Sequence, residues 1–569
     1  MNKWVIVLIG VMIVFSANLF FVTPIVFSDD NYNLTLHPAK TDQHRALYFI
    51  PVDEFKDTGS ISKDVCIYEQ RSAPYPRVHI GYALYGIIHS IVKNPFYSHF
   101  IGNVVFMSIT LLIIVLLFSR ELRPVYGLIY GAIFWGPLYD ILILKQYALA
   151  VFHFVATGTT TYLYSSLIHV YGFTTKITVA RVFVYLFILL FAYVYLSALS
   201  RRMKMFFLSI LLGISIYIHL FSAMIAYTTM GIICVYYMFK KNEEWKDTAI
   251  AIFSSLIMII PFAIHAMRIT SIYDGLETAY RYGSSTSHQF FLPSAFFSII
   301  LILCMAILYK SKRSMPWKVF FISTILSVFI AGNMQLFLPI PLPYNIVTIV
   351  YDTVIPLTLI ILFTDYFKPD KTKKYVMTFL AITTGALLLL NALASSSLIE
   401  RASSNPEMSQ ALEWIQSHNT IHDVYFADSS IQEEILLWTP VRLYYCDSYK
   451  TIISYDELTQ RAIEGQRLLV KDTESILKEV HKITSSRSYP KSNFWGKLIS
   501  SPMFGAVQNE EFTQFFEKRK ESETKYMSMN TTRSTYKLDY MIIRKNIDIY
   551  SGPGTVVFEN SKFMIISLK

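Results

Sequence analysis

The chain has 569 residues, of which 53% are hydrophobic and only 16% are Asp, Glu, Lys or Arg. Ordinary soluble domains carry about 25% charged residues, so this composition excludes a wholly soluble globule. The charge is also unevenly divided. Residues 400–569 hold 21 Lys and Arg and 22 Asp and Glu, about a quarter of the segment, whereas residues 1–399 hold 29 and 18, about 12%. We therefore predict a transmembrane domain over 1–399 and a soluble domain over 400–569.

Eleven apolar runs approach the ~20 residues needed to cross a bilayer. They fall at 4–26, 99–119, 124–143, 180–199, 205–220, 222–239, 249–267, 294–309, 318–336, 346–366 and 376–396. Short connections rich in Lys and Arg follow alternate runs, beginning with Arg120 and Arg123, and such connections face the cytoplasm. The pattern predicts a multi-pass helical membrane domain with a cytoplasmic amino terminus. Its basic excess indicates orientation and not nucleic acid binding.

Segment 144–178 is apolar, but one additional crossing there would reverse the side of every later connection. We therefore expect a re-entrant or interface-lying segment, with an ordinary hairpin as the alternative. The run 4–26 lacks an Ala-x-Ala cleavage site, so a retained helix is expected rather than a signal peptide. Two large pieces then face the extracytoplasmic side, the first outer loop 27–98 and everything after residue 397.

Two adjacent carboxylates, Asp29 and Asp30, follow the first apolar run in the order Asp29-Asp30-Asn31-Tyr32. Ionised groups at a membrane surface are costly to desolvate and are usually kept for a task. The alternative to a functional role is that these are two surface acids at a solvated helix end. Further along the same loop, His44 and Arg45 supply basic groups.

The end of the first outer loop has the pattern of an interface helix. Tyr82, Tyr85, His89 and Val92 follow helical spacing, and Tyr75-Pro76-Arg77-Val78-His79 stands before them. A carboxylate pair, basic groups and an interface helix are what an enzyme needs to act on the phosphate end of a membrane lipid.

The sequence resembles the GT-C class of polytopic membrane glycosyltransferases, which take a sugar from a polyprenyl-phosphate carrier. Three features carry the resemblance: Asp30-Asn31-Tyr32 is similar to the Asp-x-aromatic motif of the class, Tyr75-Pro76-Arg77 to the start of its interface helix, and the tail from Ala411 to an appended extracytoplasmic domain. Two departures stand out. The Trp-Trp-Asp motif of oligosaccharyltransferases is missing from the sequence, and Asp352 precedes Pro356 where several related enzymes show Arg.

The resemblance implies an inverting transfer of sugar, on the extracytoplasmic side, to a glycan, lipid or protein acceptor. Asp30 is the expected base on the acceptor hydroxyl, with Asp29 second. Positive charge for the departing phosphate is expected from Arg77, His79, His44 and Arg45. The alternative for each is that it only anchors the loop at the membrane interface.

Two residues outside the first loop are also candidates for substrate binding. Asp140 ends the third apolar run and is a second acid or a simple helix terminus. A divalent ion between Asp30 and Asp140 is conceivable but weakly supported, and no metal ligand is assigned. His219, between two short runs, lines the groove for the lipid donor or hydrogen-bonds a neighbouring helix.

The tail is predicted to be an extracytoplasmic α/β domain. A helix is expected over 407–417 with Pro406 in its first position, and strands at 424–427, 442–445, 540–543 and 563–568. No zinc site follows from the four cysteines, and whether Cys66 and Cys446 pair is left open. The competing function is a transporter or an export component for polysaccharide or lipid. Transporters often contain internal repeats, which we do not find here.

Overall fold

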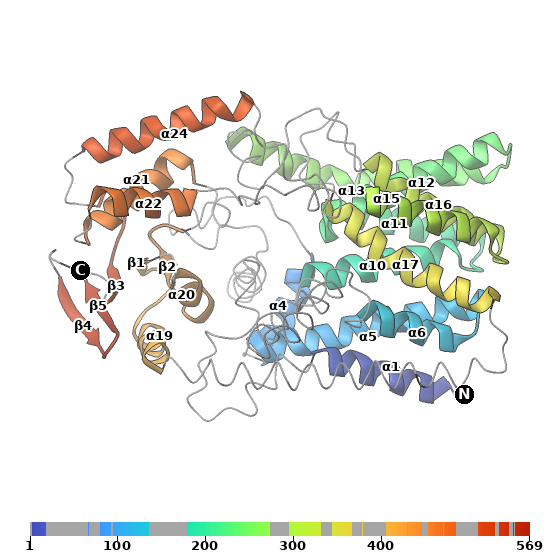
Figure 1. The fold of residues 1–569 in the computed structure, drawn as a ribbon, viewed down its shortest axis with the longest axis horizontal. Helices are drawn as coiled ribbons and strands as arrows, with labels where there is room; N and C mark the ends of the chain where they lie inside the picture. Colours follow the sequence, from blue (N-terminus) through green and yellow to red (C-terminus); the bar gives the residue numbers. More distant parts are fainter. Residues whose placement is uncertain are drawn as a thin grey trace, which may run out of the picture.

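A computed structural model describes the chain in two parts, a bundle of apolar helices and a C-terminal α/β domain (Figure 1). The described residues are 3–18, 67, 80–92, 95–135, 179–272, 295–331, 344–366, 378, 406–428, 431–446, 453–469, 472–484, 510–529, 534–545, 550, 552 and 554–569. All structural statements below concern these residues.

The helical part contains α1 (Lys3–Asn18), α4 (Ile80–Val92), α5 (Pro95–Glu121), α6 (Pro124–Trp135), α10 (Val179–Tyr195), α11 (Arg201–Ile218), α12 (Leu220–Phe239), α13 (Glu244–Ile272), α15 (Ala295–Lys310), α16 (Met315–Ala331) and α17 (Tyr344–Tyr366). Ten of the eleven predicted runs begin within about five residues of one of these helices. The eleventh run, 376–396, lies outside the described residues apart from residue 378.

The predicted count of eleven membrane crossings is not supported. Among the described residues, three helices are long and apolar enough to cross a membrane, namely Tyr97–Glu121, Leu220–Phe239 and Glu244–Arg268. Shorter apolar helices among the described residues are Ile80–Val92, Val182–Tyr195, Ser298–Lys310, Met315–Ala331 and Asp352–Leu362. A membrane-like helical domain followed by a small sheet domain is the part of the prediction that holds.

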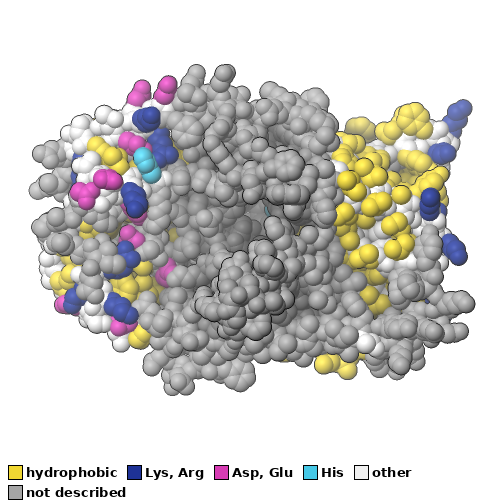
Figure 2. All heavy atoms as spheres, in the orientation of Figure 1, with side chains coloured by type: hydrophobic (Ala, Val, Ile, Leu, Met, Phe, Trp, Pro, Cys, Tyr) yellow, Lys and Arg dark blue, Asp and Glu magenta, His cyan; other side chains and the backbone are white. Residues whose placement is uncertain are grey.

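Apolar side chains are exposed in a long series on α13, which supports a membrane environment. Ile250, Phe253, Ile257, Ile260 and Ile264 recur at alternating spacings of three and four residues and are all exposed. Figure 2 shows such an apolar surface on the helical part, bordered by Lys and Arg at the end farthest from the C-terminal domain. An unpaired apolar stripe of this length is what a lipid-facing helix presents.

The basic connections between helices gather at one end of the bundle. They are joined by hydrogen bonds and ion pairs, namely Arg120 Nη1 to Leu196 O (2.6 Å), Arg313 Nη1 to Glu121 O (2.6 Å), Arg313 with Asp365, and Arg201 with Asp247. These contacts link the α5–α6, α10–α11, α12–α13 and α15–α16 connections and the end of α17. The basic connections are thus joined to one another at a common end of the bundle, and the predicted orientation in the membrane stays a prediction.

The C-terminal domain is a five-stranded sheet in the order β2-β1-β3-β5-β4. Its strands are β1 (Val424–Ala427), β2 (Arg442–Leu443), β3 (Tyr540–Arg544), β4 (Thr555–Glu559) and β5 (Phe563–Ser567). β1 pairs in parallel with β2 and β3, whereas β5 is antiparallel to β3 and β4. The predicted strands are confirmed within a few residues, and β4 is a strand that the sequence reading missed.

Helices cover both faces of this sheet (Figure 1). They are α19 (Pro406–His418), α20 (Gln432–Trp438), α21 (Tyr455–Arg467) and α22 (Thr473–Thr484), and α24 (Glu510–Ser528) packs on α21. The predicted helix at 407–417 is confirmed, and Pro406 occupies its first position, where a missing N–H costs nothing. The domain is therefore a three-layer α/β unit with an antiparallel extension.

Close packing of α21 on the sheet depends on Gly465. A Cβ at this position would lie 2.3 Å from Cε2 of Phe426, a fully buried side chain of β1. We expect Gly465→Ala to destabilise the domain by about 1–3 kcal/mol, because the ring or the helix must shift in a close-packed core. Differential scanning fluorimetry should show a Tm lower by several degrees. An unchanged Tm would mean that the α21 interface is looser than described here.

One residue of the first outer loop belongs to the sheet of the C-terminal domain. Ile67 forms a parallel bridge with Leu443 of β2, and its side chain is 0% exposed within the core of that domain. The loop therefore supplies a residue at the β2 edge, which a sheet otherwise leaves open to water. The first outer loop and the C-terminal domain are in direct contact.

We expect Ile67→Ala to weaken the C-terminal domain although it lies more than 370 residues before β2. Truncating a buried isoleucine typically costs about 2–5 kcal/mol. Limited proteolysis of the whole protein should release fragments of the C-terminal domain at a lower protease concentration. Val556→Ala, in the exposed strand β4, is the matched control and should leave the cleavage profile as in the parent.

Candidate functional site

Most of the predicted site residues lie outside the described residues. These are Asp29, Asp30, His44, Arg45, Arg77, His79 and Asp140, together with segment 144–178. Their roles stay predictions. The structure does describe the helices that flank the segment carrying six of them: α1 ends at Asn18, eleven residues before Asp29, and α4, within the last part of the predicted loop, begins at Ile80, directly after His79.

Helix α4 confirms the predicted helical spacing and shows which face is buried. Tyr82, Tyr85 and His89 are buried, whereas Ile87 and Ile91 are 51% and 77% exposed. The helix thus turns its aromatic and polar side chains inward and its isoleucines outward. It lies at the end of the bundle nearest the C-terminal domain (Figure 1). Exposed isoleucines opposite a buried polar face suit a helix that rests on lipid.

A buried chain of hydrogen bonds joins the end of α1 to α4 through α5. Tyr85 Oη donates to Asn103 Oδ1 (2.5 Å), and Asn103 Nδ2 donates to Asn18 Oδ1 (3.0 Å). Asn18 Nδ2 donates in turn to the Val14 carbonyl (2.8 Å). Asn18 and Asn103 are both 0% exposed, and buried amides without such partners would be costly. This cluster, Asn18, Tyr85 and Asn103, joins the end of α1 to α4 through α5.

Two buried histidines extend the same region. His89 Nδ1 lies 3.0 Å from Ser98 Oγ, and the ring of His99 lies 5.3 Å from that of Tyr85. Both histidines come from the junction between α4 and α5, so polar side chains concentrate where the first outer loop returns to the bundle. Buried ionisable groups at the end of a membrane bundle are candidates for function, although either histidine is also explained as a satisfied core residue.

The sequence alone did not indicate a role for Asn18, Asn103, Ser98 or His99, although its helical spacing did indicate Tyr85 and His89. A signal was present, because asparagine is costly inside an apolar run and usually marks a polar partner. Its partner could not be identified, since Asn18 and Asn103 are 85 residues apart in the chain.

His219, the one described member of the predicted set, has a local structural role. It is the N-cap of α12, and its Nδ1 accepts a hydrogen bond from the Phe221 N–H at 3.3 Å. Its ring also lies 4.9 Å from the ring of Phe221. A cap satisfies an N–H that the first turn of a helix leaves open. This explains the residue without a ligand, and the predicted part in a lipid-donor groove stays a prediction.

A buried carboxylate occupies the middle of the bundle. Asp352 of α17 accepts a hydrogen bond from Tyr185 Oη of α10 at 2.5 Å, and Tyr130 Oη of α6 donates to the Thr353 carbonyl at 2.8 Å. Asp352 lies 13 residues before Asp365, which pairs with Arg313 at the basic end, so it lies about 20 Å along the helix from that end. These two hydrogen bonds, one to Asp352 and one to the next residue, tie α17 to α10 and α6 at this level.

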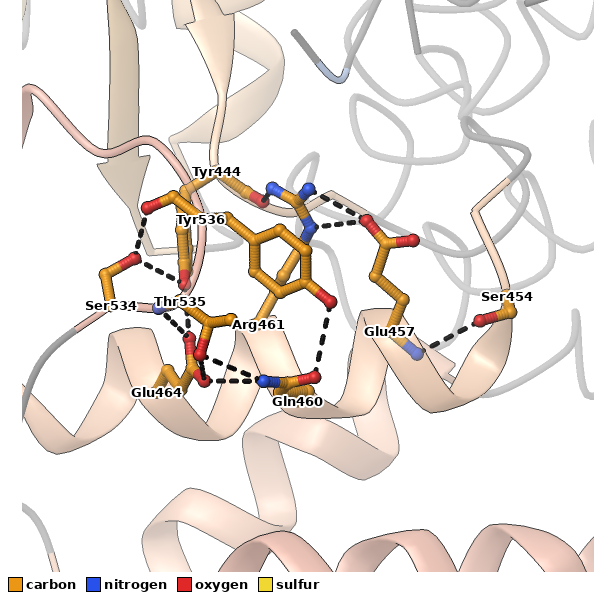
Figure 3. A network of polar contacts seen from close by, with 9 residues as sticks. All are labelled: Tyr444, Ser454, Glu457, Gln460, Arg461, Glu464, Ser534, Thr535 and Tyr536. Carbon is orange, nitrogen blue, oxygen red and sulfur yellow. Dashed lines mark hydrogen bonds and ion pairs between the residues drawn. The ribbon is translucent and has the colours of Figure 1, made fainter. Parts of the chain in front are cut away.

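The C-terminal domain contains a closed polar network around Arg461 of α21 (Figure 3). Its guanidinium is 0% exposed, donates to Glu457 Oε1 at 2.8 and 2.9 Å and to the Tyr444 carbonyl at 3.1 Å, and lies 3.7 Å from the centre of the Tyr536 ring. The network fixes segment 534–536 against α21. Because the guanidinium is surrounded by protein groups, we assign it a structural role.

Glu464 completes this network about one helical turn further along the same face of α21 (Figure 3). Burial opposes its ionisation, but hydrogen bonds from Thr535, Tyr444 and Gln460 outweigh that effect and hold the pKa of its carboxyl below the ordinary value. A carboxyl with a lowered pKa stabilises the fold at neutral pH, and this contribution is lost as the pH falls through its pKa in the folded protein.

The described residues contain no group of three or more His, Cys, Asp or Glu side chains placed to hold a metal ion. Asp30 and Asp140, the pair considered for a divalent ion, are outside that part of the chain, so no step below depends on a metal. In comparisons with known proteins, no protein-family model and no curated protein matches the sequence.

Proposed function

We propose that the protein is an integral-membrane glycosyltransferase that moves a sugar from a polyprenyl-phosphate donor to an acceptor on the extracytoplasmic side. The observation that carries the proposal is the hydrogen-bonded chain from Asn18 through Asn103 to Tyr85. It joins α1 to α4, the two helices that flank the segment holding the acid pair, Arg77 and His79. On this basis we propose that the acid pair and Arg77 lie together beside these helix ends.

The chemistry follows from what this loop carries. Asp30 accepts the proton of the acceptor hydroxyl as that oxygen attacks the anomeric carbon, while the bond from the sugar to the carrier phosphate breaks. The leaving phosphate carries the displaced electron pair and is stabilised by the positive charge of Arg77 and by donors from His79, His44 or Arg45. Attack opposite the departing phosphate inverts the anomeric centre.

The contact between the first outer loop and the C-terminal domain supports the proposal that both lie on the same side of the membrane. Ile67 follows the acid pair and precedes Arg77, and it is part of the core of the C-terminal domain. The basic connections lie at the end of the bundle farthest from that domain (Figure 2). If those connections face the cytoplasm, the loop and the domain face away from it.

A transporter or export component is the second candidate, and Asp352 favours it. A buried acid hydrogen-bonded to a tyrosine in mid-bundle is a common element of proton relays. Such a protein would move a lipid or glycan without breaking a glycosidic bond, so the two functions differ in their products.

The test is release of polyprenyl phosphate by the purified protein in lipid nanodiscs. Synthetic polyprenyl-phosphate hexoses and pentoses serve as donors, with a mixture of glycosides and membrane lipid extract as acceptors. The proposal expects polyprenyl phosphate and a new glycosylated product in matching amounts. If every donor remains intact while a donor analogue crosses the bilayer in proteoliposomes, the export function takes its place.

A further inference from the structure

The C-terminal domain has a polar position at the carboxyl ends of two neighbouring parallel strands. β1 stands between β2 and β3, and the chain goes from β1 to β2 on one side before it reaches β3 on the other. In open α/β sheets, a reversal of strand order of this kind opens a crevice beyond the carboxyl ends of the two strands, and ligands bind there. The relevant strand ends here are those of β1 and β3.

Two polar side chains meet at this position, and a third, that of Gln432, is bonded to the end of β1. Asp428 follows the last residue of β1, and Arg544 is the last residue of β3. A guanidinium nitrogen of Arg544 lies 3.4 Å from Asp428 Oδ1, so the two strand ends are bridged by an ion pair. The Arg544 side chain is 28% exposed, which leaves it within reach of a ligand.

Gln432 supplies the observation that points to a ligand. It follows β1 and is 1% exposed, and its Nε2 donates to the carbonyl of Ala427, the last residue of that strand, at 2.9 Å. Its Oε1 accepts no hydrogen bond within the described part of the chain. A buried amide oxygen without a donor is costly, and one beside a strand switch point is explained by a ligand hydroxyl that would donate to it.

We propose that this position, Asp428, Gln432 and Arg544, binds the hydroxyl groups of a neutral sugar, as the site that recognises a glycan acceptor. Asp428 accepts from a hydroxyl, Arg544 donates to one, and Gln432 can do both. The opposite charges of Asp428 and Arg544 cancel. A phosphate would be repelled by Asp428, and a cation would be repelled by Arg544. This inference rests on the proposed function for its biological role, but the binding itself requires no catalysis.

Saturation-transfer difference NMR on the whole protein tests the site. The probes are the methyl glycosides of glucose, galactose, mannose and arabinose at millimolar concentration. The protein is held in lipid nanodiscs, since maltoside detergents carry sugar themselves. We expect at least one glycoside to bind the parent, with affinity lowered about tenfold or more in Arg544→Met and in Asp428→Asn, because each loses a hydrogen bond to a charged group.

Lys545→Met is the matched control, because Lys545 is the next residue along the chain and pairs with Glu559 of β4 instead. It should bind the glycoside as the parent does. Circular dichroism melting is recorded for each variant, and Asp428→Asn, which keeps the side-chain shape, decides the matter if Arg544→Met unfolds. Glycoside binding that is equal in the parent and in a folded Arg544→Met or Asp428→Asn overturns the inference, and so does a parent that binds none of the probes.

The two proposals fail in different experiments. If the parent binds a glycoside through Arg544 but releases no polyprenyl phosphate from any donor, the sugar site stands and the transferase function falls. If sugar is transferred while both variants keep the parent's KM for the acceptor, the transferase stands and the acceptor site lies elsewhere.

Discussion

Asp30→Asn should lower the rate of sugar transfer by about 10²–10⁴-fold, the range in which a positioned general base contributes to catalysis. Asparagine has nearly the same shape as aspartate but cannot take up the proton of the acceptor hydroxyl. Donor binding should change little, so the loss is expected in kcat. Initial rates of polyprenyl phosphate release, measured at saturating donor, would show it.

Two further variants of the same loop make this test specific. Asp53, another acid in the sequence of the first outer loop, has no role in the proposed reaction, so Asp53→Asn should retain the parent rate. Asp29→Asn should cause a smaller loss and move the acidic limb of the pH–rate profile to lower pH. Removing a neighbouring negative charge lowers the pKa of Asp30, so the base stays ionised at lower pH. A parent-like rate in Asp30→Asn would refute the assignment of the base.

Arg461→Met should destabilise the C-terminal domain, with a cost of about 3 kcal/mol. Methionine retains much of the buried volume, but the half-buried Glu457 loses its charged partner, and the Tyr444 carbonyl loses the Arg461 donor. The contact with the Tyr536 ring is lost as well. Hydrogen exchange followed by mass spectrometry should show protection of β1 and α21 peptides reduced on the order of 10²-fold.

The control for this change is Lys562→Met, which removes an exposed ion pair with Glu407 in the same domain. Exposed pairs contribute little, so its exchange rates should match those of the parent. If the amides of β1 and α21 exchanged as slowly in Arg461→Met as in the parent, the network in Figure 3 would contribute little to the stability of the domain.

Local periodicity was sufficient to locate most helices and the buried strands. The apolar run of α12 was predicted at 222–239 and is found at Leu220–Phe239, and β1 was predicted at the residues where it occurs. β4 was missed because its residues are mostly exposed and lack the apolar continuity of β1 and β3.

Contacts between distant segments could not be predicted in the same way. Nothing near Asn18 indicates Asn103, and nothing near Asp428 indicates Arg544, because each pair is brought together by the fold. The predicted acids of the first loop came from a local motif, so their grouping with Arg77 and His79 remains a hypothesis about spatial arrangement. The tyrosine partner of Asp352 likewise lies 167 residues away in the chain.

The bridge between Ile67 and Leu443 has a consequence for the order in which the protein is made. These residues are 376 positions apart, so at 5–20 residues per second the ribosome needs about 20–75 s to synthesise Leu443 after Ile67. During that interval the first loop exposes an apolar residue whose partner does not yet exist. The C-terminal domain cannot complete the edge of its sheet by itself, because that edge includes Ile67, a residue made long before β2.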